Sequence, residues 1–198
     1  MIPEQFTYLG LAMSVVGSMH YLFLTIKGRV KPSKVTWLLW GLFHLIVYIG
    51  QAVNGVGAPA WNTLAASILP TMVVIASIKI KQSHWSSSIV DYILAALALL
   101  GVIASLLTGV ALYAMSFAII ADFLATIPTY RKSYLYPSSE SAFVYIVSAI
   151  GSSISLFAVQ NPQIISTLFL LYLVVSNSAI FMLIKFGIKS KDRALLSI

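Results

Sequence analysis

Seven long apolar runs follow one another along the chain and are separated by short polar segments. Each run is close to the length of about 20 residues that a helix needs to cross a bilayer. The runs are apolar on every side, whereas the strands of a membrane barrel alternate over about 10 residues. Because backbone groups in lipid need partners within their own segment, the pattern predicts an all-α membrane protein with seven transmembrane helices. The predicted spans are Phe6–Ile26, Val35–Val53, Asn62–Ile80, Val90–Thr108, Val110–Tyr130, Ser141–Gln160 and Ile164–Phe186.

The composition favours a membrane location. Hydrophobic residues make up 60% of the 198 residues and charged residues only 9%, whereas a soluble domain has about 25% charged residues. The chain has no cysteine, which excludes disulfides, thiol catalysis, iron–sulfur clusters and zinc–thiolate sites. The first run follows Met-Ile-Pro-Glu without basic residues, so we expect a retained helix rather than a cleaved signal peptide.

The positive charges are confined to one side of this predicted topology. They fall in the first, third and fifth loops and in the C-terminal tail, and cytoplasmic segments of membrane proteins carry such an excess. We therefore expect the N-terminus outside and the C-terminus in the cytoplasm, with the basic residues as membrane anchors and no nucleic-acid partner. Small size and short loops favour a bacterial inner membrane. The basic residues are Lys27, Arg29, Lys31, Lys34, Lys79, Lys81, Arg131, Lys132, Lys185, Lys189, Lys191 and Arg193.

The chain is expected to contain two parallel repeats of three helices. Pro32-Ser33 in the first basic loop recurs as Pro137-Ser138 in the fifth, and in both places a long apolar run follows. Parallel repeats related by an axis along the membrane normal are a known transporter plan. The expected units are residues 1–86, a linker helix within 87–109, and residues 110–198, which gives a 3+1+3 arrangement.

Two segments resemble the PQ-loop superfamily, which includes the SWEET sugar facilitators and lysosomal amino-acid exporters. In Lys27–Trp40 a basic turn leads into Val-Thr-Trp-Leu-Leu-Trp, a segment similar to one in a group of bacterial membrane proteins. Pro128–Ser133 lies where the superfamily has its Pro-Gln pair before a basic loop, with Thr129 in place of the glutamine. The first unit has no such pair. The resemblance implies a seven-helix transporter scaffold.

Asp122 is the most informative polar residue in the apolar runs. It lies well inside the fifth span, with no basic residue close to it in sequence. A carboxylate at the centre of a membrane helix costs about 2.5–3.5 kcal/mol on insertion scales, and burial disfavours its charged form. We therefore predict that Asp122 is a proton-coupling residue. The alternative is a neutral, hydrogen-bonded aspartate that holds two helices together.

Pro128 and Thr129 form the candidate hinge of the fifth span. Asp122, Thr126 and Thr129 follow the spacing i, i+4, i+7 and so share one helix face. Pro128 removes a backbone hydrogen bond near that face and permits a kink. Broken or kinked helices serve alternating access in transporters. The alternative is that Pro128 has no hinge role, since prolines are common in membrane helices.

The second span carries a polar and aromatic stripe at helical spacing. Trp37 is expected to anchor the helix at the membrane interface, while Trp40, almost one turn deeper, is the better candidate to stack on a substrate. His44 can hydrogen-bond a substrate, or it can join two helices. The stripe consists of Trp37, Gly41, His44, Tyr48 and Gln51.

Further substrate-binding candidates lie in the other spans. Thr71 and Ser148 offer hydroxyl groups at helical spacing with other small residues, a pattern that also serves helix packing. In SWEET-like proteins an asparagine at mid-depth of the seventh helix lines the substrate pocket, and Asn177 matches that position. The predicted substrate-binding residues are Asn177, Trp40, His44, Tyr48, Thr71 and Ser148.

These features predict a transporter of a small polar solute: a sugar, an amino acid or a vitamin-like metabolite. It would be a uniporter or proton-coupled and would alternate between two three-helix units. The alternative is a non-transporting receptor or accessory subunit on the same scaffold, and a homo-oligomer is compatible with both. An enzyme is not expected, because the chain lacks HExxH, a glycine-rich phosphate loop and a plausible Ser-His-Asp set. The three histidines are scattered, so neither a metal nor a cofactor is expected.

Overall fold

The computed structural model describes residues 3, 5–53, 58–80, 86–107, 111–158 and 164–188. These residues form seven α-helices, one short 3₁₀-helix and no strand, which confirms the all-helical prediction. The boundaries agree with the predicted runs to within a few residues at most ends. The elements are α1 (Phe6–Ile26), α2 (Lys34–Val53), α3 (Ala58–Lys79), α4 (Ile89–Leu107), α5 (Ala111–Leu135), η1 (Pro137–Ser139), α6 (Ala142–Ala158) and α7 (Ile164–Phe186).

Helix α5 is longer than its predicted span. It continues five residues beyond Tyr130, so Arg131 and Lys132 lie in its last turns and not in a loop. Arginine and lysine are good helix formers, and nothing before Pro137 forces the helix to stop. The residue before a proline is disfavoured in the helical conformation, which explains why α5 ends at Leu135.

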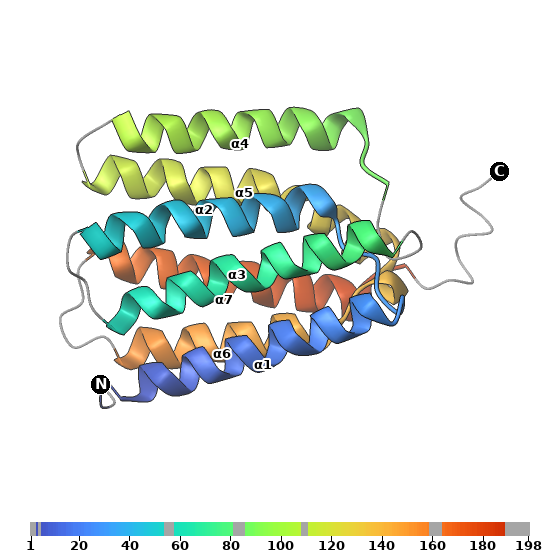
Figure 1. The fold of residues 1–198 in the computed structure, drawn as a ribbon, viewed down its shortest axis with the longest axis horizontal. Helices are drawn as coiled ribbons and strands as arrows, with labels where there is room; N and C mark the ends of the chain where they lie inside the picture. Colours follow the sequence, from blue (N-terminus) through green and yellow to red (C-terminus); the bar gives the residue numbers. More distant parts are fainter. Residues whose placement is uncertain are drawn as a thin grey trace.

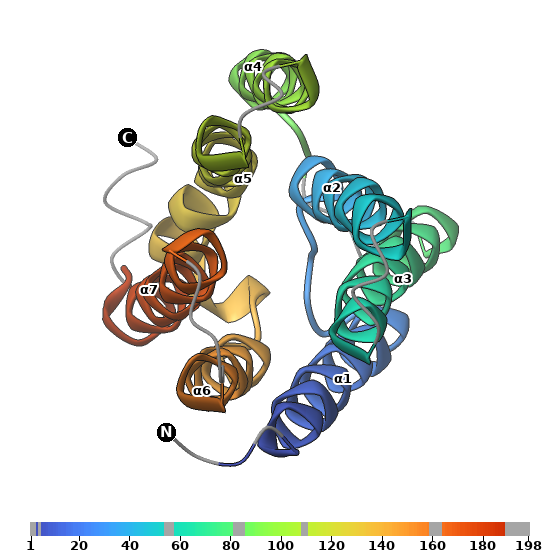
Figure 2. The same ribbon diagram turned by 90° about the vertical axis from the view of Figure 1, so that its left-hand side faces the viewer.

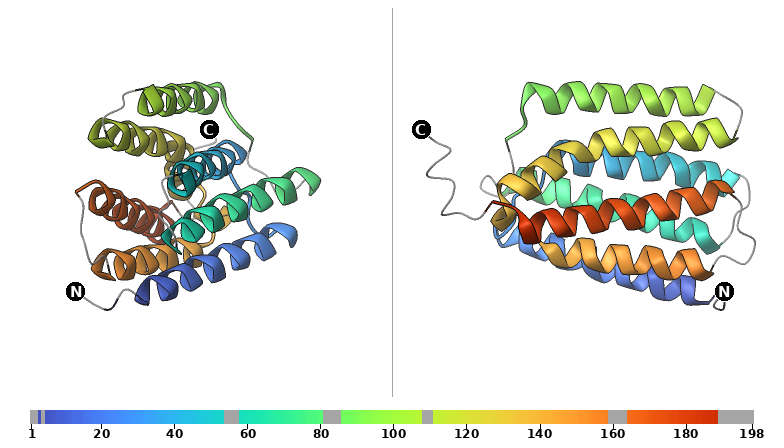
Figure 3. Two further views of the ribbon diagram at one scale, coloured as in Figure 1. Left: turned by 60° about the vertical axis from the view of Figure 1, so that its left-hand side comes forward. Right: turned by 180° about the vertical axis from the view of Figure 1, so that it is seen from behind.

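The helices run up and down side by side along one direction (Figures 1 and 3). Seen from the end, α1, α3, α2, α5, α7 and α6 follow one another around a ring, and α4 lies outside it against α5 and α2 (Figure 2). In each half the third helix packs between the other two: α3 between α1 and α2, and α7 between α5 and α6. The division into units 1–86, 87–109 and 110–198 stays a prediction.

One end of the bundle is basic. Helices α1, α3, α5 and α7 all finish there, and α2, α4 and α6 begin there (Figure 1). Lys27 follows α1, and Lys79, Lys132 and Lys185 lie in the last turns of α3, α5 and α7. We call this the basic end. The described part of the charge segregation predicted along the sequence therefore lies at one end of the bundle, while Lys81, Lys189, Lys191 and Arg193 lie outside the described residues.

The turn between α1 and α2 is closed by local hydrogen bonds. Gly28 has a φ of 66°, a left-handed conformation that glycine adopts without steric cost. Its N–H donates to the Thr25 carbonyl and the Arg29 N–H to the Leu24 carbonyl, which is the Schellman arrangement at a helix C-terminus. The turn directs the chain through Pro32 and Ser33 into α2, and so places Trp37 and Trp40 inside the bundle.

Large apolar side chains cover the outside of the bundle, while many polar side chains lie within it. Leu107, Phe186 and Ile89 have exposed fractions of 80%, 74% and 73%. The buried polar group includes Thr25, Ser77, Asp122, Thr126, Thr129, Lys132, Glu140 and Ser176. In a soluble monomer a large exposed apolar surface is unusual, and such a surface marks a site of contact with a membrane or with another protein.

Two helices are long and apolar enough to cross a membrane: Phe6–Ile26 and Thr167–Phe186. In the part of the chain that the structure describes, four more helices contain shorter apolar stretches: Lys34–Ile46, Leu64–Lys79, Ile89–Ala104 and Ala142–Ala158. Length and composition thus give weak support to membrane association.

The two halves meet most closely where α1 crosses α6. A Cβ atom added at Gly10 would lie 2.6 Å from Ser155 Oγ and 2.7 Å from the Gly151 carbonyl oxygen. Such distances leave no room for a side chain, so the two backbones touch directly. Small residues permit this kind of approach between membrane helices.

We expect Gly10→Ala to lower the free energy of unfolding by about 1–3 kcal/mol, because the added methyl group overpacks the α1–α6 contact. Gly17→Ala is the matched control: its Cβ would lie 3.4 Å from Val144 Cα on the same pair of helices, an ordinary contact. The measurement is an unfolding titration in detergent, followed by tryptophan fluorescence. Equal stability of the two variants would contradict the expectation.

Candidate functional site

Five side chains from three helices meet in the middle of the bundle. We call them the central cluster: Trp40 and His44 from α2, Asp122 and Thr126 from α5, and Tyr172 from α7. Helix α2 belongs to the first half of the chain and α5 and α7 to the second. The cluster therefore lies where the halves face each other, away from the apolar outer surface of the bundle.

Asp122 is the centre of this cluster and is only 6% exposed. The Tyr172 hydroxyl donates to its carboxylate Oδ2 at 2.6 Å, a short bond typical of charge-assisted or carboxyl contacts. The Thr126 hydroxyl lies 2.7 Å from the Asp122 backbone carbonyl and 3.5 Å from the same Oδ2. Asp122 is thus held in place from its own helix and from α7.

Trp40 and His44 connect the first half to this carboxyl group. The indole N–H of Trp40 donates to Thr126 Oγ1 at 3.2 Å. His44 Nδ1 lies 2.7 Å from the Trp40 carbonyl oxygen, and since a carbonyl only accepts, Nδ1 is the protonated nitrogen. His44 is close enough to Asp122 for an electrostatic interaction. His44 thus brings an imidazole ring from α2 to the cluster.

Aromatic and hydroxyl groups extend the cluster on the α7 side. The Phe169 ring lies 6.4 Å from His44 and 6.3 Å from Tyr172, measured between centroids. Nearer the basic end, the hydroxyls of Tyr130 and Ser176 lie 2.7 Å apart. The cluster thus combines one acid, one imidazole, hydroxyl donors and flat aromatic faces, which together can bind a small polar molecule and exchange a proton with it.

Three of the predicted site residues are brought together here, namely Asp122, Trp40 and His44. Tyr172, which donates to Asp122, was not among the predicted residues. Tyrosine is common in this sequence, and only the packing of α5 against α7 shows which tyrosine faces the aspartate.

Other predicted residues lie outside the central cluster. Asn177 donates its amide N–H to the Leu173 carbonyl of its own helix at 2.9 Å. Thr71 is exposed and donates to the Ser67 carbonyl in α3. Tyr48 is half-buried one turn beyond His44. Ser148 lies on α6, which packs against α1 and α7 rather than against α2 or α5. Their substrate role stays a prediction.

The hinge candidates lie within a helix that is continuous through Pro128. Pro128 has no N–H to donate to the carbonyl four residues earlier. Thr129 beside it and Ser133, one turn further on, are both fully buried. Within the described part of the chain neither hydroxyl has a hydrogen-bond partner. Unpaired buried hydroxyls are rare in folded proteins and require an explanation.

The expectation that Trp37 anchors α2 at the membrane interface is wrong. Trp37 is 2% exposed and stacks on Tyr21, with the ring centroids 4.4 Å apart. Stacking on another aromatic ring in the bundle removes the indole from the surface. The residue lies near the basic end, as expected, but it faces inward.

A second polar cluster lies at the basic end and was not predicted. It consists of Lys132, Glu140, Tyr21 and Tyr145, and we call it the basic-end cluster. Lys132 forms an ion pair with Glu140, and both side chains are fully buried. The expectation that Lys132 is a surface anchor is therefore wrong. The short turn through η1 returns the chain toward α5 and presents Glu140 to it. An isolated acid within a basic loop was the sequence signal.

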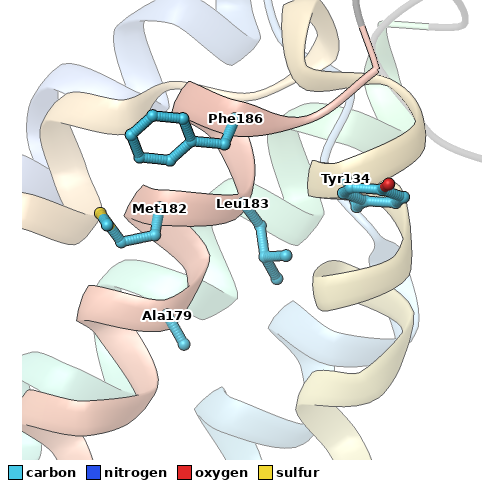
Figure 4. Close-up of a pocket in the computed structure, with 5 residues that line it drawn as sticks. All are labelled: Tyr134, Ala179, Met182, Leu183 and Phe186. Atoms are coloured by element: carbon cyan, nitrogen blue, oxygen red, sulfur yellow. The ribbon is translucent and has the colours of Figure 1, made fainter.

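A groove also lies on the outside of the bundle, between the ends of α5 and α7 (Figure 4). Its volume is about 350 Å³, and its lining is almost wholly apolar. It contains no predicted substrate-binding residue. The lining residues are Tyr134, Ala179, Met182, Leu183 and Phe186.

In the part of the chain that the structure describes, no three histidine, aspartate or glutamate side chains gather as metal ligands would. Comparisons of the chain with protein-family models, curated proteins and solved structures find no match. The resemblance to the PQ-loop superfamily thus stays an expectation.

Proposed function

We propose that this chain is a membrane-embedded transporter of a small polar solute, located in a bacterial inner membrane with the basic end in the cytoplasm. The observation that carries the proposal is the central cluster. A buried aspartate, a histidine and two aromatic donors lie between the two halves of a bundle whose outer surface is apolar. Polar groups inside a membrane bundle are costly, and they usually serve a solute or proton pathway.

The outer surface supports a membrane location for the whole bundle. Exposed leucine, isoleucine and phenylalanine side chains occur on every helix from α1 to α7, whereas polar side chains are concentrated inside and at the ends. Helix α2 has 20 residues and α5 has 25. At a rise of 1.5 Å per residue, helices of this size span about 30 Å or more, the thickness of the hydrocarbon core. All seven helices are proposed to cross the bilayer.

The chemistry of the central cluster suits a solute with hydroxyl, amine or amide groups. Trp40 and Phe169 supply flat apolar faces, and Tyr172, Thr126 and His44 supply hydrogen-bonding atoms. Such a combination suits sugars, amino acids and vitamin-like heterocycles. The carboxyl group of Asp122 would either orient the solute directly or carry a proton along with it. Because both halves contribute, a relative motion of the halves would change access to the solute, as alternating access requires.

The alternative function is a receptor or accessory subunit that binds through the same cluster without moving a solute. Substrate counterflow separates the two. Purified protein in proteoliposomes would be tested with sugars, amino acids and vitamin precursors, with and without a pH gradient. Saturable exchange of one class of solute is the expected result. No exchange across the whole panel, from folded protein inserted in a known orientation, would overturn the transporter and favour the receptor.

A further inference from the structure

The basic-end cluster joins the two halves of the chain at a single carboxyl group. Glu140 belongs to the second half and accepts from the Tyr21 hydroxyl of α1 at 2.8 Å and from the Tyr145 hydroxyl of α6 at 3.2 Å. Lys132 pairs with the same carboxylate, and its ammonium also donates to the Lys31 carbonyl in the α1–α2 turn. Two groups of the first half, the Tyr21 hydroxyl and the Lys31 carbonyl, thus hydrogen-bond to one ion pair of the second half.

The two basic loops also contact each other through their backbones. The Lys31 N–H donates to the Ser139 carbonyl at 2.8 Å, so the α1–α2 turn lies directly against η1. These loops contain the Pro-Ser pairs of the two predicted repeats. Equivalent segments of the two halves therefore meet at the basic end and close the bundle there.

A line of buried polar residues leads from the central cluster to this closure. Asp122, Thr126, Thr129 and Ser133 follow the spacing i, i+4, i+7, i+11 on one face of α5, and all four are buried. At 1.5 Å per residue the line is about 16 Å long. Among the residues that the structure describes, the hydroxyls of Thr129 and Ser133 have no hydrogen-bond partner, which is expected of groups that meet water or a solute in another conformation.

From this arrangement we propose that the basic-end cluster is the cytoplasmic gate of the transporter, shown here closed. Opening separates Tyr21 and Lys31 of the first half from Lys132, Glu140 and Tyr145 of the second, and admits water along the α5 line to Asp122. The inference rests on the proposed function. It names the residues whose separation exposes the central cluster to the cytoplasmic side.

The energetics of buried ion pairs suit such a gate. The attraction between the two charges is largely offset by the loss of their hydration, so a buried pair is a weak net source of stability. When the halves separate, water returns to both charges. The closed and the hydrated open arrangements can then have similar free energies, whereas an equally buried apolar contact would strongly favour the closed one.

The test is the reactivity of a single cysteine in the line behind the gate. Because the chain has no cysteine of its own, Thr129→Cys can be labelled selectively with a charged, membrane-impermeant methanethiosulfonate added to the basic side of membrane vesicles. We expect slow labelling in this background. Adding Glu140→Gln is expected to raise the rate by about tenfold, the factor by which the open fraction would grow. Asp91→Asn, a buried acid that caps α4 at the same end, is the control and should leave the rate unchanged.

A milder variant guards against misfolding of Glu140→Gln. Tyr21→Phe with Tyr145→Phe removes both hydroxyl donors but keeps the ion pair, and it too is expected to speed labelling from the basic side. Rates within about twofold of the parent in both folded variants, less than a 1 kcal/mol change in the opening equilibrium, would overturn the gate. The measurement needs no substrate. Faster labelling without counterflow of any solute would support the gate and contradict the transporter function. Counterflow with unchanged labelling would support the transporter function and contradict the gate.

Discussion

Replacing Asp122 by asparagine is expected to abolish accumulation of the solute driven by a pH gradient. Asparagine keeps the shape of the side chain and an oxygen that can accept from Tyr172, but it cannot take up or release a proton. With one proton moved per solute, each unit of pH gradient can support about tenfold accumulation. The variant should show none, while counterflow without a gradient persists. The measurement is solute uptake into proteoliposomes at several imposed gradients.

The control for this prediction is Asp91→Asn. Asp91 accepts from the Ser88 N–H at the start of α4, far from the central cluster in the chain, and asparagine retains that acceptor. Its accumulation should match that of the parent. If Asp122→Asn accumulated solute as well as the parent does, Asp122 would be a structural residue that holds α5 to α7. A parent that shows counterflow but no response to pH would be a uniporter.

Removing one member of the Lys132–Glu140 pair is expected to cost about 3–5 kcal/mol of unfolding free energy, because the remaining charge stays buried without its partner. Lys132→Met and Glu140→Gln should each show this loss. The double variant Lys132→Met/Glu140→Gln carries no buried charge, and the amide oxygen can still accept from Tyr21 and Tyr145. It should recover most of the loss. SDS titration in a mild detergent gives the free energies.

Lys185→Met is the matched control for the pair. Lys185 lies in the last turn of α7 at the same end and is exposed, so its removal should change stability by less than about 0.5 kcal/mol. The sign of the coupling in the double-mutant cycle decides the outcome. Losses that simply add in the double variant would mean that the two charges do not stabilise each other, which would contradict the ion pair as the source of the effect.

The helices could be predicted from the sequence because each is specified locally. An apolar run of membrane length has to satisfy its own backbone, and Pro137 and Gly28 mark ends that depend only on neighbouring residues. Asp122 could be flagged for the same reason, since a carboxyl group in an apolar run is conspicuous without any knowledge of its neighbours. His44 was indicated by its place in the polar and aromatic stripe of the second run, and Trp40 by its depth in that run.

The partners of these residues depend on which helices pack together. Tyr172 follows Asp122 by 50 positions, and no local pattern distinguishes it from the other tyrosines. Lys132 was misread because a lysine beside a membrane span usually reaches the interface. Its burial depends on η1, which returns the chain so that Glu140 meets it. Trp37 was misplaced in the same way, since its stacking partner Tyr21 lies on another helix.

In the opening proposed above, the close approach of Gly10 and Gly151 would serve as the pivot between the halves, because the two backbones touch there with only the small side chains of Ser14 and Ser155 beside them. The contact lies near the start of α1, whereas Tyr21 lies eleven residues further toward the basic end. Helix α1 rises about 16 Å between Gly10 and Tyr21. Rotating α1 by about 10° against α6 around Gly10 would therefore displace the Tyr21 hydroxyl by about 3 Å, away from Glu140. In the proposed opening, a rotation of this size is therefore enough to break the hydrogen bond between Tyr21 and Glu140 at the basic end.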